Sequence, residues 1–221
     1  MIQTKMPFMT ANYWDETWRG LKMPKESLLS FFEKLGQLDE FSYLYGYLRV
    51  QLAPTLYCNK AGTLLNLSMT HLPLHKIFLA KKKYFEEALG VQSFILKESH
   101  QGVLVYFYKK ESLEAHLGQE EIQLFLKKYK YKDPANLSDA LKTLKRHFQN
   151  SCPHEVGIFL GYPTCDVLGF STLGGKKCKF KGYWCVYQNV DFSKKIFAQY
   201  DAIKLKTMAQ VMDEYKLKQS V

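Results

Sequence analysis

The chain has 221 residues, of which 47% are hydrophobic and 15% aromatic, and its formal net charge is +10. This length and composition exclude a disordered chain and predict a domain with a full hydrophobic core. No window approaches the ~20 apolar residues of a membrane span. The opening segment MIQTKMPFMTANYWDETWRG has acidic residues and no apolar core, so we do not expect a secretory signal.

The charge and the cysteines narrow the class of protein further. A positive chain attracts nucleic acids and anionic ligands. Lysine outnumbers arginine and no arginine cluster is present, so a solvated lysine-rich surface is favoured and nucleic-acid binding is permitted without being indicated. Five cysteines, an odd number without a compact framework, indicate reduced thiols and a cytoplasmic protein.

The first half of the chain predicts an arm, helices and a first strand. Residues 1–24 form an N-terminal arm that aromatic side chains dock onto the body: Tyr13, Trp14 and Trp18. Helical spacing of apolar residues follows in 25–35, ended by Gly36, and again in a second helix that should end before Ala53–Pro54. The segment APTL is then expected to form a turn, followed by a loop that carries Lys60 and a strand over 63–69.

The second half predicts a hairpin, more helices and two further strands. A helix over 77–89 should end at Gly90, and strands over 91–99 and 102–110 should pair around a short turn. Helices are expected over 119–130 and 137–149, strands over 155–162 and 182–187, and a long amphipathic helix at the end. This order predicts an α+β fold with a mostly antiparallel sheet and several flanking helices, in a single compact domain over 25–221.

The stretch CPHEVGIFLGYPTCDVLGF, residues 152–170, holds the densest group of reactive side chains. In a strand, alternation would place Val156 and Tyr162 on one face and Glu155 on the other, together with two glycines that leave room for a helix or a ligand. His154 and Glu155 would then point to opposite faces and would not act on each other. Each has a catalytic interpretation and a structural one, in which His154 caps the strand and Glu155 pairs with a lysine.

Two neighbouring segments could each bind an anion or have a purely structural role. Pro163 suits the start of a helix, and Asp166 in its first turn complements the helix dipole, which favours a structural role over an anion site. The loop STLGGKKCKFKG carries four lysines but lacks the ending of a phosphate-binding Walker loop. An exposed hairpin tip is favoured over a basic flap above a ligand.

The cysteines allow a metal site or a nucleophile. Four of the five lie between 152 and 185 without a close pair, so small buried hydrophobes are favoured over zinc ligands and no metal site is predicted. The run HEVGIFLGY is also similar to a strand of cysteine peptidases of the NlpC type, which would make Cys58 the nucleophile and His154 its base. The nucleophile of that family starts a helix, whereas Cys58 precedes a predicted strand.

A second resemblance covers more of the chain. The runs PHEVGIFLGYP, DVLGF and GYWCVY, a later FAQYD, and the upstream APTL with Lys60 and LVYFYKK resemble the DUF3793 proteins of anaerobic and fermentative Gram-positive bacteria. The likeness runs from about residue 25 to about 205. It departs from the family pattern at Cys152, Cys165 and Cys185. The family is one of unknown function, so the resemblance implies only places to examine: Pro54, Thr55, Lys60, His154, Glu155, Tyr162, Asp166, Tyr183 and Trp184.

Three hypotheses follow. In the first, the protein binds, and in one version transforms, a small anionic metabolite or cofactor where the Lys60 loop meets the His154 segment. Lys60 would neutralise the anion and His154 or Glu155 would move a proton. The candidate ligand-binding residues are Thr55, Lys60, Tyr162, Asp166, Tyr183 and Trp184. The second hypothesis is a non-enzymatic interaction module for RNA or protein, without a pocket at His154, and the third is the Cys58–His154 hydrolase. No motif specifies a substrate, a cofactor or an oligomeric state.

Overall fold

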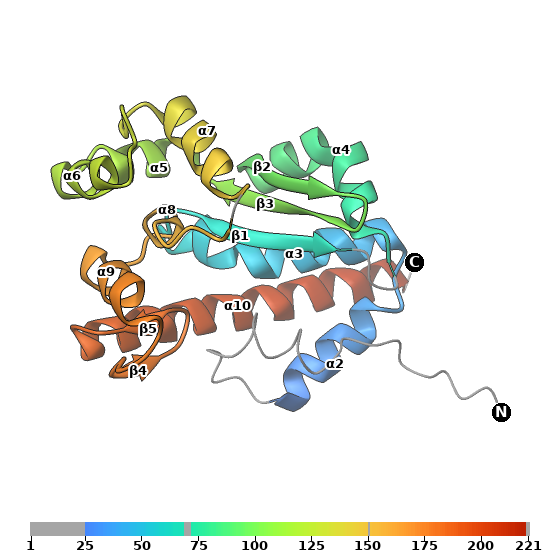
Figure 1. Cartoon of the computed structure of the whole chain (residues 1–221). Coiled ribbons are helices and arrows are strands. Elements are labelled where there is room, and N and C mark those ends of the chain that lie inside the picture. Colours follow the sequence, from blue (N-terminus) through green and yellow to red (C-terminus); the bar gives the residue numbers. More distant parts are fainter. Residues whose placement is uncertain (1–24, 69–71, 150, 220–221) are drawn as a thin grey trace.

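A computed structural model describes residues 25–68, 72–149 and 151–219 of the chain. The predicted arm over 1–24 lies outside these residues. The helices and strands follow one another in this order (Figure 1): α2 Lys25–Leu35, α3 Glu40–Tyr57, β1 Thr63–Ser68, α4 Leu74–Leu89, β2 Gln92–Ser99, β3 Gly102–Tyr108, α5 Lys110–Leu117, α6 Glu120–Lys128, α7 Leu137–His147, α8 Val156–Phe159, α9 Thr164–Leu173, β4 Phe180–Lys181, β5 Cys185–Val186 and α10 Val190–Gln219. The predicted α+β class is confirmed.

A three-stranded antiparallel sheet lies at the centre, in the order β1–β3–β2. The predicted hairpin forms β2 and β3, and β1 pairs with the other side of β3. Within β3, Val103, Val105 and Phe107 pack into one apolar core, whereas Tyr106 and Tyr108 pack into a second. This alternation is the side-chain period of a strand that is covered on both faces.

Helices cover the two faces of the sheet. The core on the Val105 side is closed by α2, α3, α4 and the C-terminal half of α10, and the core on the Tyr106 side by α5 to α8. The predicted helix that ends at Gly90 is confirmed as α4, and Gly90 adopts the left-handed conformation common after a helix C-terminus. Helix α5 lies between the hairpin and α6, in a segment for which no helix was predicted.

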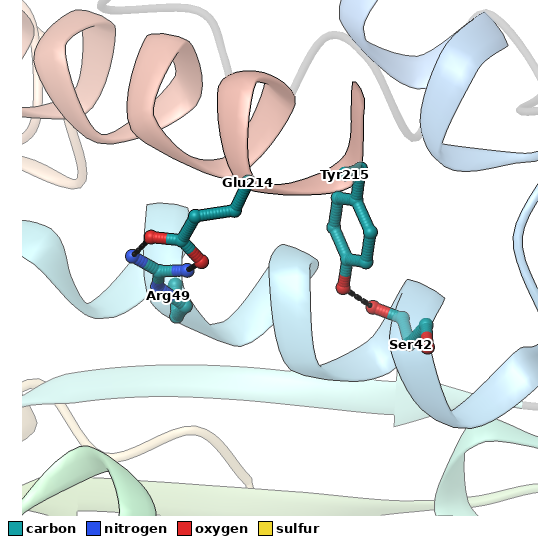
Figure 2. Close-up of polar contacts among 4 residues, drawn as sticks. All are labelled: Ser42, Arg49, Glu214 and Tyr215. Carbon is teal, nitrogen blue, oxygen red and sulfur yellow. Dashed lines mark hydrogen bonds and ion pairs between the residues drawn. The ribbon is translucent and has the colours of Figure 1, made fainter. Parts of the chain in front are cut away.

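The longest helix, α10, lies along α3, on the side of α3 away from the sheet (Figure 1). Figure 2 shows two polar contacts of this packing. Arg49 of α3 makes a two-pronged ion pair with Glu214 of α10, and the Tyr215 hydroxyl donates to the backbone oxygen of Ser42 at 2.8 Å. These two contacts join residues that are 165 and 173 positions apart in sequence, and they fix how α10 lies along α3.

Helix α3 does not end before Ala53–Pro54, so that prediction is wrong. Its start is capped by Asp39, whose carboxylate accepts from two backbone amides, and it continues through Pro54 to Tyr57. A proline removes one helical hydrogen bond and disfavours helix in the residue before it. Here the turn around Pro54 is buried from Val50 to Thr55, and this packing outweighs the local preference. The APTL segment is therefore the last helical turn of α3.

The predicted strand over 155–162 is also wrong, because the segment forms the short helix α8 and a turn. Val156 to Leu160 are all buried. Because every residue of this run is buried, the alternation of side chains on which the strand prediction rested carries no information, and a short apolar run does not distinguish a strand from a buried helical turn. The chain reverses at Gly161, whose φ of +76° favours glycine. A Cβ at Gly157 would meet Val167 at 2.7 Å, so this glycine admits a protein neighbour.

The predicted strand over 182–187 is reduced to the two residues of β5, which pair with β4 in a small hairpin. Behind it, Trp184 and Val186 pack on Phe197 and Tyr200 of α10. No helix among the described residues has the length and apolar character needed to cross a membrane.

Candidate functional site

A cavity of about 340 Å³ lies beside the outer edge of the sheet. Its floor is the edge strand β1, of which four consecutive residues, 63–66, line the space. The other walls come from α3 and the loop after it, from β3, from the turn after α8, from the β4–β5 hairpin and from α10: Gln51, Pro54, Lys60, Leu104, Leu160, Tyr162, Gly182, Tyr183 and Lys204. Parts of the chain that are far apart in sequence therefore meet here.

The end of α3 positions Lys60. The Pro54 carbonyl accepts from the amides of Cys58 and Lys60, at 2.9 and 3.3 Å, and this turns the chain back toward β1. The Lys60 side chain is buried, where it donates to the backbone oxygen of Gly62 and lies 3.5 Å from the Thr63 hydroxyl. Lys60 forms no ion pair with any residue in the described parts of the chain.

A second buried lysine faces the same cavity. Lys204, in the middle of α10, is 4% exposed and its Nζ lies 5.3 Å from the centre of the Tyr183 ring. Burial, and to a smaller extent the positive charge of Lys204, lowers the pKa of Lys60 to about 7. Burial likewise lowers the pKa of Lys204 to about 8, against a smaller opposing effect of the Asp201 carboxylate. Two ammonium groups in one buried site favour an anion between them.

Gln51 supplies a third donor. Its Oε1 accepts from Lys204 Nζ at 3.3 Å, and its Nε2 has no hydrogen-bond partner among the described residues. The residue is 3% exposed and lines the cavity. A buried amide without an acceptor costs about 1 to 3 kcal/mol, and an oxygen of a ligand in this cavity would satisfy it.

Tyr183 is fixed at the cavity wall as a neutral phenol. Its hydroxyl donates to Asp201 at 2.9 Å, and burial, together with the Asp201 charge, raises its pKa. Next to the cavity, the hydroxyls of Thr55 and Thr63 are 2.8 Å apart and buried. Thr55 therefore acts on the site through Thr63 and does not line it.

A second cavity, of about 400 Å³, contains His154. Its walls are mostly apolar, with Val156, Val167, Phe170 and Trp184 among them. The interaction-module hypothesis predicted no pocket at His154, and that prediction is wrong. His154 is exposed and its ring packs edge-on against Phe170, with the ring centroids 5.5 Å apart.

Asp166 organises the wall of this second cavity. Its carboxylate accepts from Trp184 Nε1 at 2.8 Å and from the backbone amides of Tyr187 and Gln188 at 2.7 and 3.1 Å. It is 2% exposed. Asp166 therefore ties α9 to the segment after β5, in addition to its favourable place in the first turn of α9.

Glu155 lines neither cavity. Its carboxylate is buried and lies 2.5 Å from His147 Nδ1 of α7 and 3.4 Å from the Tyr131 hydroxyl. Burial, and then the Glu155 charge, raises the pKa of Tyr131. The expected lysine partner is thus a histidine, and the geometry is that of a structural link between α7 and α8.

Cys58 lies at the C-terminal end of α3. The nucleophile of the NlpC-type peptidases instead lies at the start of a helix. Burial raises the pKa of its thiol, which disfavours the reactive thiolate. Among the described residues no three His, Cys, Asp or Glu side chains form a metal-binding group, and all five cysteines are free thiols.

The predicted site residues fall into two groups that meet at Tyr162. Lys60 and Tyr183 line the smaller cavity, His154, Asp166 and Trp184 line the larger one, and Tyr162 lines both while stacking on Trp184, with ring centroids 4.8 Å apart. Sequence reasoning missed Gln51 and Lys204. The position of Lys204 four residues after Tyr200, on the apolar side of the last helix, is a signal that could have identified it.

Comparison with known proteins assigns most of the chain to a family. A family model described as "Protein of unknown function (DUF3793)" matches residues 48–221, which include both cavities. No curated protein and no solved structure matches the chain.

Proposed function

The chain belongs to the DUF3793 family, whose function is unknown, and we therefore propose its function from its own cavity: the protein binds a small anion between Lys60 and Lys204. We place this activity in the cytoplasm, where the five free thiols would remain reduced. The observation that carries the proposal is the pair of buried lysines lining one cavity.

The charge balance supports an anion over a neutral ligand. Lys60 and Lys204 contribute two positive charges, and Asp201, beside Tyr183, supplies one negative charge whose effect reaches Lys204. A singly or doubly charged anion would neutralise the remainder. It would also raise the pKa of the lysine that it contacts toward the ordinary range, because an opposite charge stabilises an ammonium group.

The size and polarity of the cavity support a ligand of metabolite size. A volume of about 340 Å³ lies at the small end of the range for ligand sites. Leu64, Leu65 and Leu160 provide apolar surface, while the donors lie on α3, on the loop that follows α3, and on α10. The ligand we expect is therefore a short carbon skeleton with at least one carboxylate or phosphate group.

Thermal unfolding tests the proposal. Oxalate, lactate and phosphate are each compared with chloride at matched ionic strength. At about 100 times its Kd, a ligand adds about 3 kcal/mol of stability, which raises Tm by about 6 to 12 °C for a chain of this size. We expect at least one of the three anions to do so.

Two variants of one helix provide the control. Lys204→Met should abolish the shift, and Lys206→Met should retain it, because Lys206 lies on the exposed side of α10. The proposal fails if no anion stabilises the wild type, or if the Lys204→Met protein is stabilised as much as the Lys206→Met protein. Retention on a polyanion resin that depends on Lys206 and not on Lys204 would instead favour the interaction module.

A further inference from the structure

We propose that the anion is a small 2-oxo acid or a similar carbonyl compound, and that the Lys60 amine forms an imine with its carbonyl carbon. This inference rests on the proposed function, because the same cavity must first hold the anion. It adds a covalent step and assigns different roles to the two lysines.

The surroundings of Lys60 are those of a nucleophilic amine. The side chain is buried at the cavity wall, has no carboxylate partner among the described residues, and has a second lysine as a neighbour. Burial and a nearby cation are two means by which proteins keep a lysine neutral and reactive. In agreement, the pKa of Lys60 is lowered to about 7, so about half of the amine is unprotonated at neutral pH.

The remaining donors suit the carboxylate of the same molecule. Lys204 Nζ and Gln51 Oε1 are 3.3 Å apart, so the Gln51 side chain is held beside the ammonium group, and its Nε2 has no acceptor within the described parts of the chain. A carboxylate that accepts from Lys204 would leave the adjacent keto carbon free to approach Lys60. Lys204 thus acts as the anion anchor and Lys60 as the reacting group.

The reaction balances without a further reactant. The lone pair of the Lys60 nitrogen attacks the keto carbon, a proton passes from nitrogen to the carbonyl oxygen, and a carbinolamine results. Loss of that hydroxyl group as water, with formation of the C=N bond, gives the imine. The Thr63 hydroxyl lies 3.5 Å from Nζ and is hydrogen-bonded to Thr55, so it stands where a proton must move.

Borohydride trapping tests the inference with pyruvate as the probe. Borohydride reduces an imine to a stable secondary amine, which intact mass and peptide mapping locate. A lysine of ordinary pKa, about 10.4, is neutral in only about one molecule in a few thousand at pH 7, so Lys60 should carry more than about ten times the adduct of any lysine of ordinary pKa. Lys60→Met should remove this adduct, Lys206→Met should keep it, and lactate, which has no keto group, should reduce it by competition.

The pH dependence gives a readout that does not require a variant. Trapping should rise as pH increases through about 7 and then level off, following the Lys60 amine. The other titratable groups that line or adjoin the cavity are Lys204 and Asp201 of α10, and the phenols Tyr162 and Tyr183. Both phenol pKa values are raised by burial, so neither phenol should titrate in this range.

The outcomes separate the two proposals. If lactate and pyruvate both raise Tm but no adduct forms on Lys60, the anion site stands and the imine is refuted. If neither anion raises Tm and the adducts are spread over surface lysines, both proposals fail. An adduct confined to Lys60, blocked by lactate and dependent on Lys204, supports both.

Discussion

Replacing Lys60 with methionine should stabilise the protein at neutral pH. The folded chain lowers the pKa of Lys60 from the ordinary 10.5 to about 7. Each pH unit between these values corresponds to about 1.4 kcal/mol, so burial of the charged form opposes folding by about 5 kcal/mol at low pH and by about 4 kcal/mol at pH 7. Methionine gives up the hydrogen bonds to Gly62 and Thr63, about 1 kcal/mol. We expect a net gain of about 3 kcal/mol.

The sign of the pH dependence follows from the direction of the shift. Between pH 7 and 10.5 the unfolded chain holds a proton on Lys60 that the folded chain has released, so the stability of the wild type rises with pH across this window. The Lys60→Met protein lacks this dependence. Its advantage should therefore be full below pH 7 and should shrink steadily as pH approaches 10.5.

Urea unfolding of the two proteins at pH 7 and at pH 9.5 measures this difference, and groups common to both proteins cancel. Lys206→Met removes the same charge from an exposed position of α10 and should change stability by less than about 0.5 kcal/mol. A Lys60→Met protein that is less stable than the wild type at pH 7, or a stability difference that is the same at both pH values, would contradict this prediction.

Three further changes test the structural roles assigned above. Asp166→Ala should destabilise the protein by about 3 kcal/mol, because the indole of Trp184 and two backbone amides lose their acceptor. Urea unfolding followed by tryptophan fluorescence measures the loss of stability, and a loss below about 1 kcal/mol would contradict this role. Glu155→Gln should lower stability by about 1 to 3 kcal/mol, because the pairing with His147 is lost. The rise in Tm that an anion causes should remain, and its loss would show that Glu155 belongs to the site. Tyr215→Phe should cost about 1 kcal/mol, the value of its bond to the Ser42 carbonyl, and an unchanged unfolding midpoint would argue against this contact (Figure 2).

Sequence patterns predicted those parts of the fold in which one local rule acts alone. Gly90 ended α4, and the hairpin of β2 and β3 formed around its short turn. The patterns failed where burial is complete. The segment 156–160 is apolar on all sides, so periodicity carried no information, and the packing around Pro54 outweighed its effect on the helix.

The candidate site was predicted only in part, because motifs do not show which distant segments come together. Lys60, Tyr162 and Tyr183 were identified from motifs and lie at one cavity, but the motifs did not show that His154 lines a different one. Lys204 completes the site from a helix about 140 residues beyond Lys60 in sequence. Only the docking of α10 along α3, which depends on contacts distant in sequence, brings the two lysines together.

The most direct test of the central claim is a crystal structure of the protein grown with oxalate. We expect oxalate in the cavity beside β1, with its oxygens about 3 Å from Nζ of Lys60 and of Lys204, the distance of charge-assisted hydrogen bonds. Oxalate bound only at surface lysines, with the cavity holding water, would contradict it.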